Sequence, residues 1–273
     1  MVSWKQGCEK VCQRRQALRR GGGYAVRAAE WNRPLAPFRL FGRRVPGEVP
    51  RMRRMELYEV MRSAFSAREF RDEPVSDEVL SRIFENARYA PSGGNRQGGH
   101  VVVVREQATK DVISELTKTA ARRYTAQQMA GESPWNTWAP TKVSDETIAA
   151  TPVPPMLSEP VRRAPVVIVV CVDVRVVASV DQLLPRVGMA SGASIYPLAW
   201  NILLAARNEG LGGTLTTMPI AEERKLQELL GLPPYMAVAT VMPVGWPVKQ
   251  LTKLKRKPVR EFVHRERFDG AAW

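Results

Sequence analysis

Apolar residues recur at helical spacing in the part of the chain that follows residue 54. In residues 57–64 they fall at positions i, i+3, i+4 and i+7, which predicts a helix with one buried face. A second helix is predicted over 77–90, because Ser76 and the two acidic residues after it suit the start of a helix. A third is predicted from 107 to about 129. The residues expected to face inward in this third helix are Val112, Ile113 and Leu116.

Continuous apolar runs, rich in β-branched residues, predict three strands. They cover residues 101–104, 165–173 and 237–244. The first run does not alternate with polar residues, so we expect it to be buried on both faces. A short helix from 221, ended by Gly231, is predicted before the last strand. These elements indicate one folded domain over residues 55–273.

A stretch of 20 residues between Arg186 and Arg207 carries no charge, which is long enough to consider a membrane span. Pro197, Asn201 and the small residues from Gly188 to Ser194 argue against that interpretation. They favour a buried helix that packs closely against another helix. We therefore expect no membrane segment here.

Residues 131–160 interrupt the pattern. They contain six prolines together with Trp135, Trp138 and Met156, and show little periodicity. A stretch of this length without elements of its own usually carries function or mobility. It is equally well interpreted as an exposed excursion whose tryptophans cover a small satellite core.

The net charge of +14 is unevenly distributed. Residues 1–54 hold 14 basic and 3 acidic residues, so residues 55–273 keep 41 − 14 = 27 basic and 27 − 3 = 24 acidic ones. The basic character therefore belongs to the leader, for which three interpretations stay open. It is a disordered leader resembling a transit peptide, a segment upstream of a true start at Met55, or an arm that binds nucleic acid.

Cysteine usage indicates a reducing compartment. Cys171 lies in an apolar run, and one buried cysteine in the body argues against a disulfide framework. Cys8 and Cys12 have no second pair or nearby histidine to complete a zinc site. We expect a cytoplasmic protein without a bound metal.

A polar loop with the sequence Ala-Pro-Ser-Gly-Gly-Asn-Arg-Gln occupies residues 90–97. Pro91 cannot continue the preceding helix, and Gly93 lets the backbone approach a flat ligand closely. Ser92, Asn95 and Gln97 offer hydroxyl and amide groups at short intervals. Such a loop can hold an aromatic heterocycle, although by itself it is also typical of an ordinary helix-to-strand turn.

This loop resembles the A-P-S-x-x-N-x-Q loop of the FMN-dependent nitroreductase family, which lies against the isoalloxazine and ribityl chain. Three further segments match in the same order: Ser66 with Arg68, Gly212 to Thr217, and Arg256 before Pro258. The resemblance covers about residues 55–273. Ala64 and Phe65 stand where the family often has basic residues, and whether Arg62 compensates is open.

The resemblance implies a fold, a cofactor and an assembly. The fold is an α+β arrangement of three layers, α-β-α, with a central mixed sheet flanked by helices. Two copies form an intertwined homodimer around the uncharged Gly188–Ala206 helix, with the flavin sites between subunits. The residues implied in FMN binding are Ser66, Arg68, Pro91, Ser92, Gly93, Asn95, Gln97, Leu215, Thr216, Thr217 and Arg256.

It also implies an activity, the reduction of nitroaromatics, quinones or related electron-poor rings by NAD(P)H in a ping-pong mechanism. Flavin N5 carries the hydride, so no catalytic side chain is expected. Residues 131–160 correspond to a lid or pocket wall, with Trp135 and Trp138 as candidates for stacking on the substrate. The acceptor and the preferred nicotinamide stay open.

Two relatives of the same fold provide alternatives. One is a reductive dehalogenase similar to iodotyrosine deiodinase, whose Lys-Arg-Lys-Pro ending resembles Lys255 to Pro258. The other is the flavin-fragmenting benzimidazole synthase. A nucleic-acid-binding protein acting through residues 1–54 is the alternative from another class.

Overall fold

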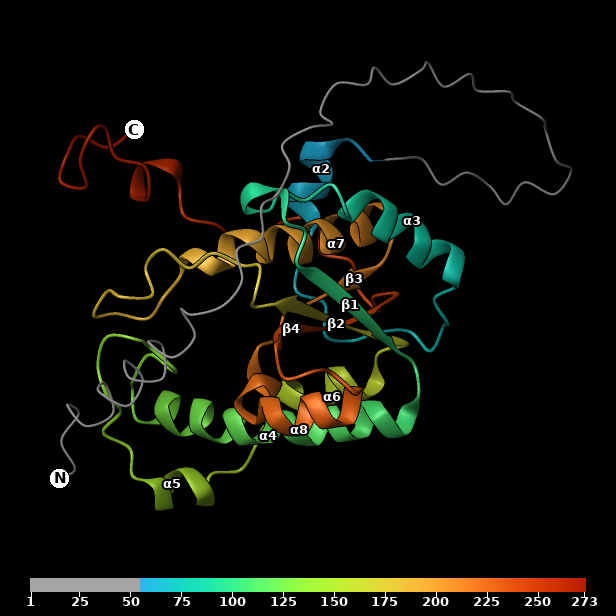
Figure 1. The fold of residues 1–273 in the computed structure, drawn as a ribbon, viewed down its shortest axis with the longest axis horizontal. Coiled ribbons are helices and arrows are strands. Elements are labelled where there is room, and N and C mark those ends of the chain that lie inside the picture. Colours follow the sequence, from blue (N-terminus) through green and yellow to red (C-terminus); the bar gives the residue numbers. More distant parts are fainter. Residues whose placement is uncertain (1–54) are drawn as a thin grey trace, which may run out of the picture. The chain divides into compact units, whose positions relative to one another are not determined.

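The structure, a computed structural model, describes residues 55–273 (Figure 1). The predictions for residues 1–54, including those for Cys8 and Cys12, lie outside the described residues. The main helices are α2 (Leu57–Ser63), α3 (Asp77–Ala87), α4 (Gln107–Met129), α5 (Asp145–Ala150), α6 (Pro155–Arg163), α7 (Tyr196–Asn208) and α8 (Glu223–Leu230). The strands are β1 (Gly99–Val104), β2 (Val166–Asp173), β3 (Gly212–Gly213) and β4 (Met236–Gly245).

The strands form one four-stranded sheet in the order β1-β2-β4-β3, and neighbouring strands are antiparallel. A mixed sheet is expected, and the parallel pairing found among the described residues is one isolated bridge between Ser66 and Gly213. Every residue of β2 is buried, as its sequence predicts. In β1 only Val104 is buried, so the expectation of a strand buried on both faces is wrong. β1 pairs with β2 alone and is an edge of the sheet, where one side lacks a covering strand.

Helices cover both faces of the sheet and give the three layers that the family resemblance implies (Figure 1). Successive side chains of a strand point to opposite faces, and β2 follows this rule. Val166, Ile168 and Val170 pack with α3 and α7 in one core cluster. Val167 and Val169 belong to a second cluster with residues of α4, α6 and α8. Cys171 joins this second cluster, and burial raises the pKa of its thiol to about 11.

The predicted helices form with small corrections. The Ser76 hydroxyl accepts a hydrogen bond from the backbone N–H of Val79 at 3.4 Å and caps α3 as expected. In α4, Ile113 is fully buried but Val112 is 43% exposed, so its predicted inward orientation is wrong. The buried stripe of α4 runs through Lys110, Ile113 and Thr117 at helical spacing, which leaves the neighbouring position outside.

Residues 131–160 contain more structure than their composition predicts, since α5 and the first part of α6 lie within them. Pro155 occupies the first turn of α6, where a missing N–H is harmless. α6 packs on α4, and Ser114 Oγ donates a hydrogen bond to the carbonyl of Ser158 at 3.0 Å. The irregular part is therefore limited to 131–144 and a short connection after α5.

The uncharged segment forms a shorter helix than expected. α7 begins only at Tyr196, and Ala190–Ser194 forms a separate 3₁₀ turn. Ile195 breaks the helical run with φ −123° and ψ −54°, and Pro197 lies in the first turn of α7. Among residues 55–273, no helix combines the length and the apolar character that crossing a membrane requires.

Candidate functional site

The polar loop at 91–97 is held in an uncommon backbone conformation. Gly94, Asn95 and Gln97 have positive φ values of 62°, 50° and 50°, a region that non-glycine residues rarely enter. Two hydrogen bonds support this conformation: Gln97 N–H donates to Ser92 Oγ at 2.9 Å, and Gly93 N–H donates to Ser194 Oγ at 3.0 Å. The side chains of Asn95 and Gln97 remain exposed. The loop thus presents its polar groups outward on a fixed backbone.

A pocket of about 260 Å³ adjoins this loop. Three of the residues predicted to bind the cofactor line it: Pro91, Ser92 and Gln97. α3 contributes Phe84 and α7 contributes Leu198 to its apolar side. Gly93 and Asn95 belong to the same loop but do not line this pocket.

A second pocket, of about 130 Å³, lies where α2, α7 and β3 meet. Ser66, Leu215 and Arg256 line it, as does Arg207, which the sequence analysis does not predict. Thus a serine and two arginines, from three distant parts of the chain, line one pocket.

Gly212 and Gly213 make this pocket possible through close backbone packing. A Cβ atom at Gly212 would lie 2.8 Å from the Ala67 Cβ, and one at Gly213 would lie 2.9 Å from the Pro243 carbonyl oxygen. Neither distance is compatible with a side chain. The paired glycines are therefore required for the β3 edge to approach the segment that carries Ser66.

The remaining predicted residues lie beside the second pocket without lining it. Arg68 is exposed, and its Nη1 donates to the Ser66 carbonyl at 3.3 Å. Thr216 is fixed by a backbone bridge with Val241, in which both N–H groups donate at 2.9 Å. Thr217 follows it and is exposed. Arg62 is the open candidate to replace the basic residue that is absent at position 64. It does not line the pocket, and its guanidinium lies 6.0 Å from the centre of the Tyr58 ring.

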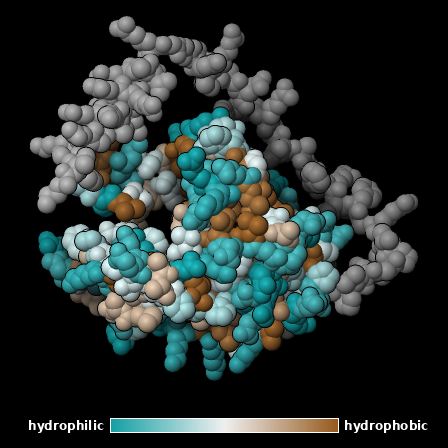
Figure 2. Space-filling view, turned by 90° about the horizontal axis from the view of Figure 1, so that it is seen from below, coloured by the Kyte–Doolittle hydropathy of each residue, from teal (hydrophilic) through white to brown (hydrophobic). Residues whose placement is uncertain are grey.

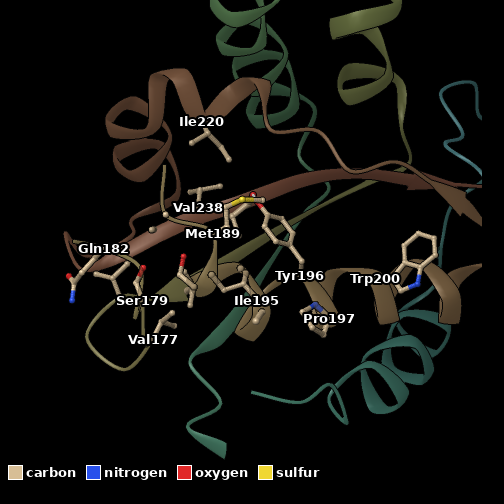
Figure 3. A pocket seen from close by; sticks show the side chains of 18 of the residues that line it. Val177, Ser179, Gln182, Met189, Ile195, Tyr196, Pro197, Trp200, Ile220 and Val238 are labelled. Atoms are coloured by element: carbon tan, nitrogen blue, oxygen red, sulfur yellow. The ribbon is translucent and has the colours of Figure 1, made fainter. Parts of the chain in front are cut away.

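A larger cavity of about 1190 Å³ lies between α7 and the ends of β2 and β4. In Figure 3, Tyr196 and Met189 point toward each other inside it, with Ile220 on the opposite wall. Its lining is mainly apolar. Trp200 lines both this cavity and the 130 Å³ pocket, so the two spaces adjoin around one side chain.

Asp181 stabilises the loop before α7, which forms one wall of this cavity. Its carboxylate accepts hydrogen bonds from the Met189 N–H at 2.7 Å, Arg186 Nη1 at 2.9 Å, Ser179 Oγ at 3.1 Å and the Ala190 N–H at 3.2 Å. These bonds, that of Met189 first, hold the pKa of the Asp181 carboxyl well below its usual range. The ionised carboxylate thereby fixes the loop that brings Ser179 and Met189 to the cavity.

The two candidate tryptophans lie apart from these three spaces. Trp135 Nε1 donates to the Ala120 carbonyl at 3.2 Å, and the Arg123 guanidinium lies 4.4 Å from its ring. Trp135 is thus held against α4, although it is 44% exposed. Trp138 is 97% exposed.

Comparisons with known proteins define the class to which this chain belongs. Residues 61–246 match the model of the nitroreductase family. Over 223 residues the chain is 30% identical to iodotyrosine deiodinase 1 of Rattus norvegicus, an alignment covering 81% of this chain and 73% of the relative.

Two solved structures share the fold. Oxidized iodotyrosine deiodinase bound to FMN and 3-iodo-L-tyrosine aligns with a TM-score of 0.56 at 20% identity, over 78% of this chain and 100% of that one. The NADPH:FMN oxidoreductase of Vibrio harveyi complexed with NAD⁺ aligns with a TM-score of 0.54 at 20% identity, over 78% and 77%. The chain belongs to the nitroreductase family and is a flavoprotein oxidoreductase.

Proposed function

We propose that the chain binds FMN between two copies of itself and passes electrons from NAD(P)H to an electron-poor aromatic acceptor such as a nitroaromatic or a quinone. The observation that carries this proposal is the 130 Å³ pocket, in which Ser66 and Arg256 meet. A guanidinium suits a phosphate through paired donors in a fixed plane, and a hydroxyl adds a further donor. One such pocket fits the single phosphate of FMN.

The loop at 91–97 completes the site from a second copy. Within one chain, the loop borders the 260 Å³ pocket, whereas Ser66, Leu215 and Arg256 border the other, and no residue lines both. We therefore assign the two sets of contacts to different copies of the chain. In this arrangement Ser92, Asn95 and Gln97 would hold the ring system through hydrogen bonds. Leu215 and Thr216 support it from the chain that holds the phosphate.

When bound, FMN supplies a site, N5, that accepts and delivers a hydride. The chain contributes placement: the apolar cavity beside Trp200 offers an aromatic acceptor a water-poor surface. NAD(P)H and the acceptor would share this cavity, so we expect ping-pong kinetics. Trp138 is the candidate for closing over the acceptor, since Trp135 is engaged with α4. We place the enzyme in the cytoplasm because its one cysteine in the described residues is a buried thiol.

Cofactor binding is tested with Arg256→Glu, which places a negative charge beside the phosphate. We expect FMN affinity to fall roughly 10- to 100-fold or more, because losing one hydrogen bond to a charged group weakens binding by about that factor. Quenching of FMN fluorescence by the apoprotein measures it. Lys257→Glu is the matched control, because Lys257 lies in the same basic run but does not line the pocket. Unchanged FMN affinity in the Arg256 variant would refute the phosphate assignment.

Reductive dehalogenation is the second candidate. The 30% identity to rat iodotyrosine deiodinase 1 and the Lys255–Pro258 ending favour it. Anaerobic turnover of nitroaromatic, quinone and iodotyrosine acceptors, each with NADH, NADPH or dithionite as reductant, separates the two. Bleaching of the flavin by a nicotinamide followed by nitro or quinone reduction supports our proposal. Iodide release with dithionite alone would replace it by the dehalogenase.

A further inference from the structure

Arg207 supplies a basic side chain to the 130 Å³ pocket, where the segment that resembles the family's phosphate motif has none at positions 64 and 65. The motif segment carries Ala64 and Phe65, and both line this pocket. Arg62 is exposed and turned toward Tyr58. Arg207 instead enters from α7, a helix more than a hundred residues further along the chain.

The contacts of Arg207 fix its side chain at one end only. Its Nε donates to Ser63 Oγ at 3.0 Å, and that hydroxyl donates to the Glu59 carbonyl at 2.7 Å. The Ser63 carbonyl in turn accepts from Gln250 Nε2 at 3.1 Å. This chain of bonds anchors the Arg207 stem to the end of α2. Among residues 55–273, its two terminal nitrogens have no hydrogen-bond acceptor and form no salt bridge.

The electrostatic state of Arg207 points to an anionic partner. Burial lowers the pKa of its guanidinium, while the charge of Glu59 opposes that shift. An arginine nevertheless stays protonated near neutral pH. A partly buried charge without a salt-bridge partner is unfavourable, and an anion entering the pocket would relieve this cost.

We propose that Arg207 binds the phosphate of FMN together with Arg256 and Ser66, and replaces the basic residue that is absent at Ala64. This inference rests on the proposed FMN site. Two guanidinium groups match the charge of a phosphate monoester, about −1.5 to −2 near neutral pH. The methyl side chain of Ala64 leaves the pocket open to Arg207. An arginine at position 64 would occupy the same small volume.

The test compares FMN with riboflavin, which lacks the phosphate. Affinities for both are measured by fluorescence quenching with apoprotein of the wild-type chain, Arg207→Met and the matched control Arg62→Met. We expect Arg207→Met to weaken FMN binding roughly 10- to 100-fold and to leave riboflavin binding unchanged. The control is expected to bind both flavins like the wild type.

A rescue experiment separates phosphate binding from a structural role. Adding Ala64→Arg to the Arg207→Met chain should restore much of the preference for FMN over riboflavin, because it returns a guanidinium to the same pocket. Equal losses for both flavins would show that Arg207 only anchors α2. A loss specific to FMN without rescue would overturn the claim that Arg207 replaces a basic residue at position 64. If Arg207→Met does not fold, Arg207→Lys takes its place, with a smaller loss specific to FMN expected.

The outcomes distinguish this inference from the proposed function. If the wild-type chain prefers FMN and the Arg207→Met chain keeps this preference, only the inference is overturned. Failure of the wild-type chain to bind either flavin would overturn the proposed function.

Discussion

Asp181 stabilises the wall of the 1190 Å³ cavity although it does not line the cavity itself. Its carboxylate gathers two backbone N–H groups and two side chains of the loop before α7. The folded state lowers the pKa of this carboxyl, so it contributes stability above the pKa of the unfolded chain, about 3.9. That contribution is lost as the pH falls further, through the folded pKa.

Asp181→Asn should therefore lower the melting temperature at pH 7, and its deficit relative to the wild type should shrink progressively below about pH 4. Thermal unfolding followed by circular dichroism at several pH values measures both. Asp269→Asn is the control, because the Asp269–Arg267 pair at 2.9 Å is exposed and contributes little. A deficit that is independent of pH would mean that the carboxylate charge is not what holds the loop.

At the scale of residues, local chemistry is predicted well and long-range placement is not. The Ser76 cap depends on three neighbouring positions, and the sequence predicts it correctly. Arg207 was missed because nothing next to it in sequence resembles a phosphate motif. Its role emerges only when α7 packs beside α2 and β3. An arginine directly after a long uncharged run of sequence, in a chain whose phosphate motif lacks a basic residue, is the signal that could have revealed it.

At the scale of helices and strands, local features are again predicted well and long-range features are not. The bounds of α4 and the burial of β2 agree with the sequence pattern, because periodicity and apolar runs are local properties. The edge position of β1 is decided by which strands pair, and no run of valines encodes that. The late start of α7 depends on the backbone break at Ile195. Residues 131–160 were underestimated because proline marks the starts of helices as well as their ends.

A pair of substitutions tests the difference between a central and an edge strand. Ile168 in β2 and Val103 in β1 are direct partners across the two strands, but Ile168 is fully buried and Val103 is 37% exposed. Ile168→Ala leaves a cavity between layers and should lower the free energy of unfolding by about 2–5 kcal/mol. Val103→Ala should lower it by about 1 kcal/mol or less.

Urea denaturation at neutral pH measures these two values. Equal effects would mean that β1 is covered in solution, for instance by a second chain, rather than being a free edge. Because the strands are paired, the double variant should also be measured. Its departure from additivity gives the coupling across the β1–β2 pair.

Residues 55–273 expose many large apolar side chains. Figure 2 shows hydrophobic residues gathered in the middle of one face. The last segment of the chain extends away from the sheet in Figure 1, with Phe262 62% and Phe268 89% exposed. On α7, Tyr196 and Trp200 are 46% and 41% exposed at a spacing of one helical turn. Surfaces of this kind mark interaction sites.

We therefore predict a two-fold homodimer in which α7 and the C-terminal segment contact the second copy. The same assembly would bring the loop at 91–97 of one copy to the Ser66–Arg256 pocket of the other, as the proposed flavin site requires. Sedimentation velocity at micromolar concentration should give a mass twice that of the 30.6 kDa chain. Trp200→Glu should shift it toward the monomer, since a carboxylate would be buried against the partner.

Trp138→Glu is the matched control for this substitution. It changes the same residue type on a more exposed part of the surface, outside α7, and should leave the dimer intact. Flavin content discriminates further, since dissociation separates the two halves of the site. The Trp200 variant should lose FMN at least in proportion to its monomer fraction, since Trp200 also lines the 130 Å³ pocket, whereas the Trp138 variant should keep it. A wild-type chain that sediments as a monomer with one FMN bound would show that a single copy supplies the whole site, and the shared arrangement would be abandoned.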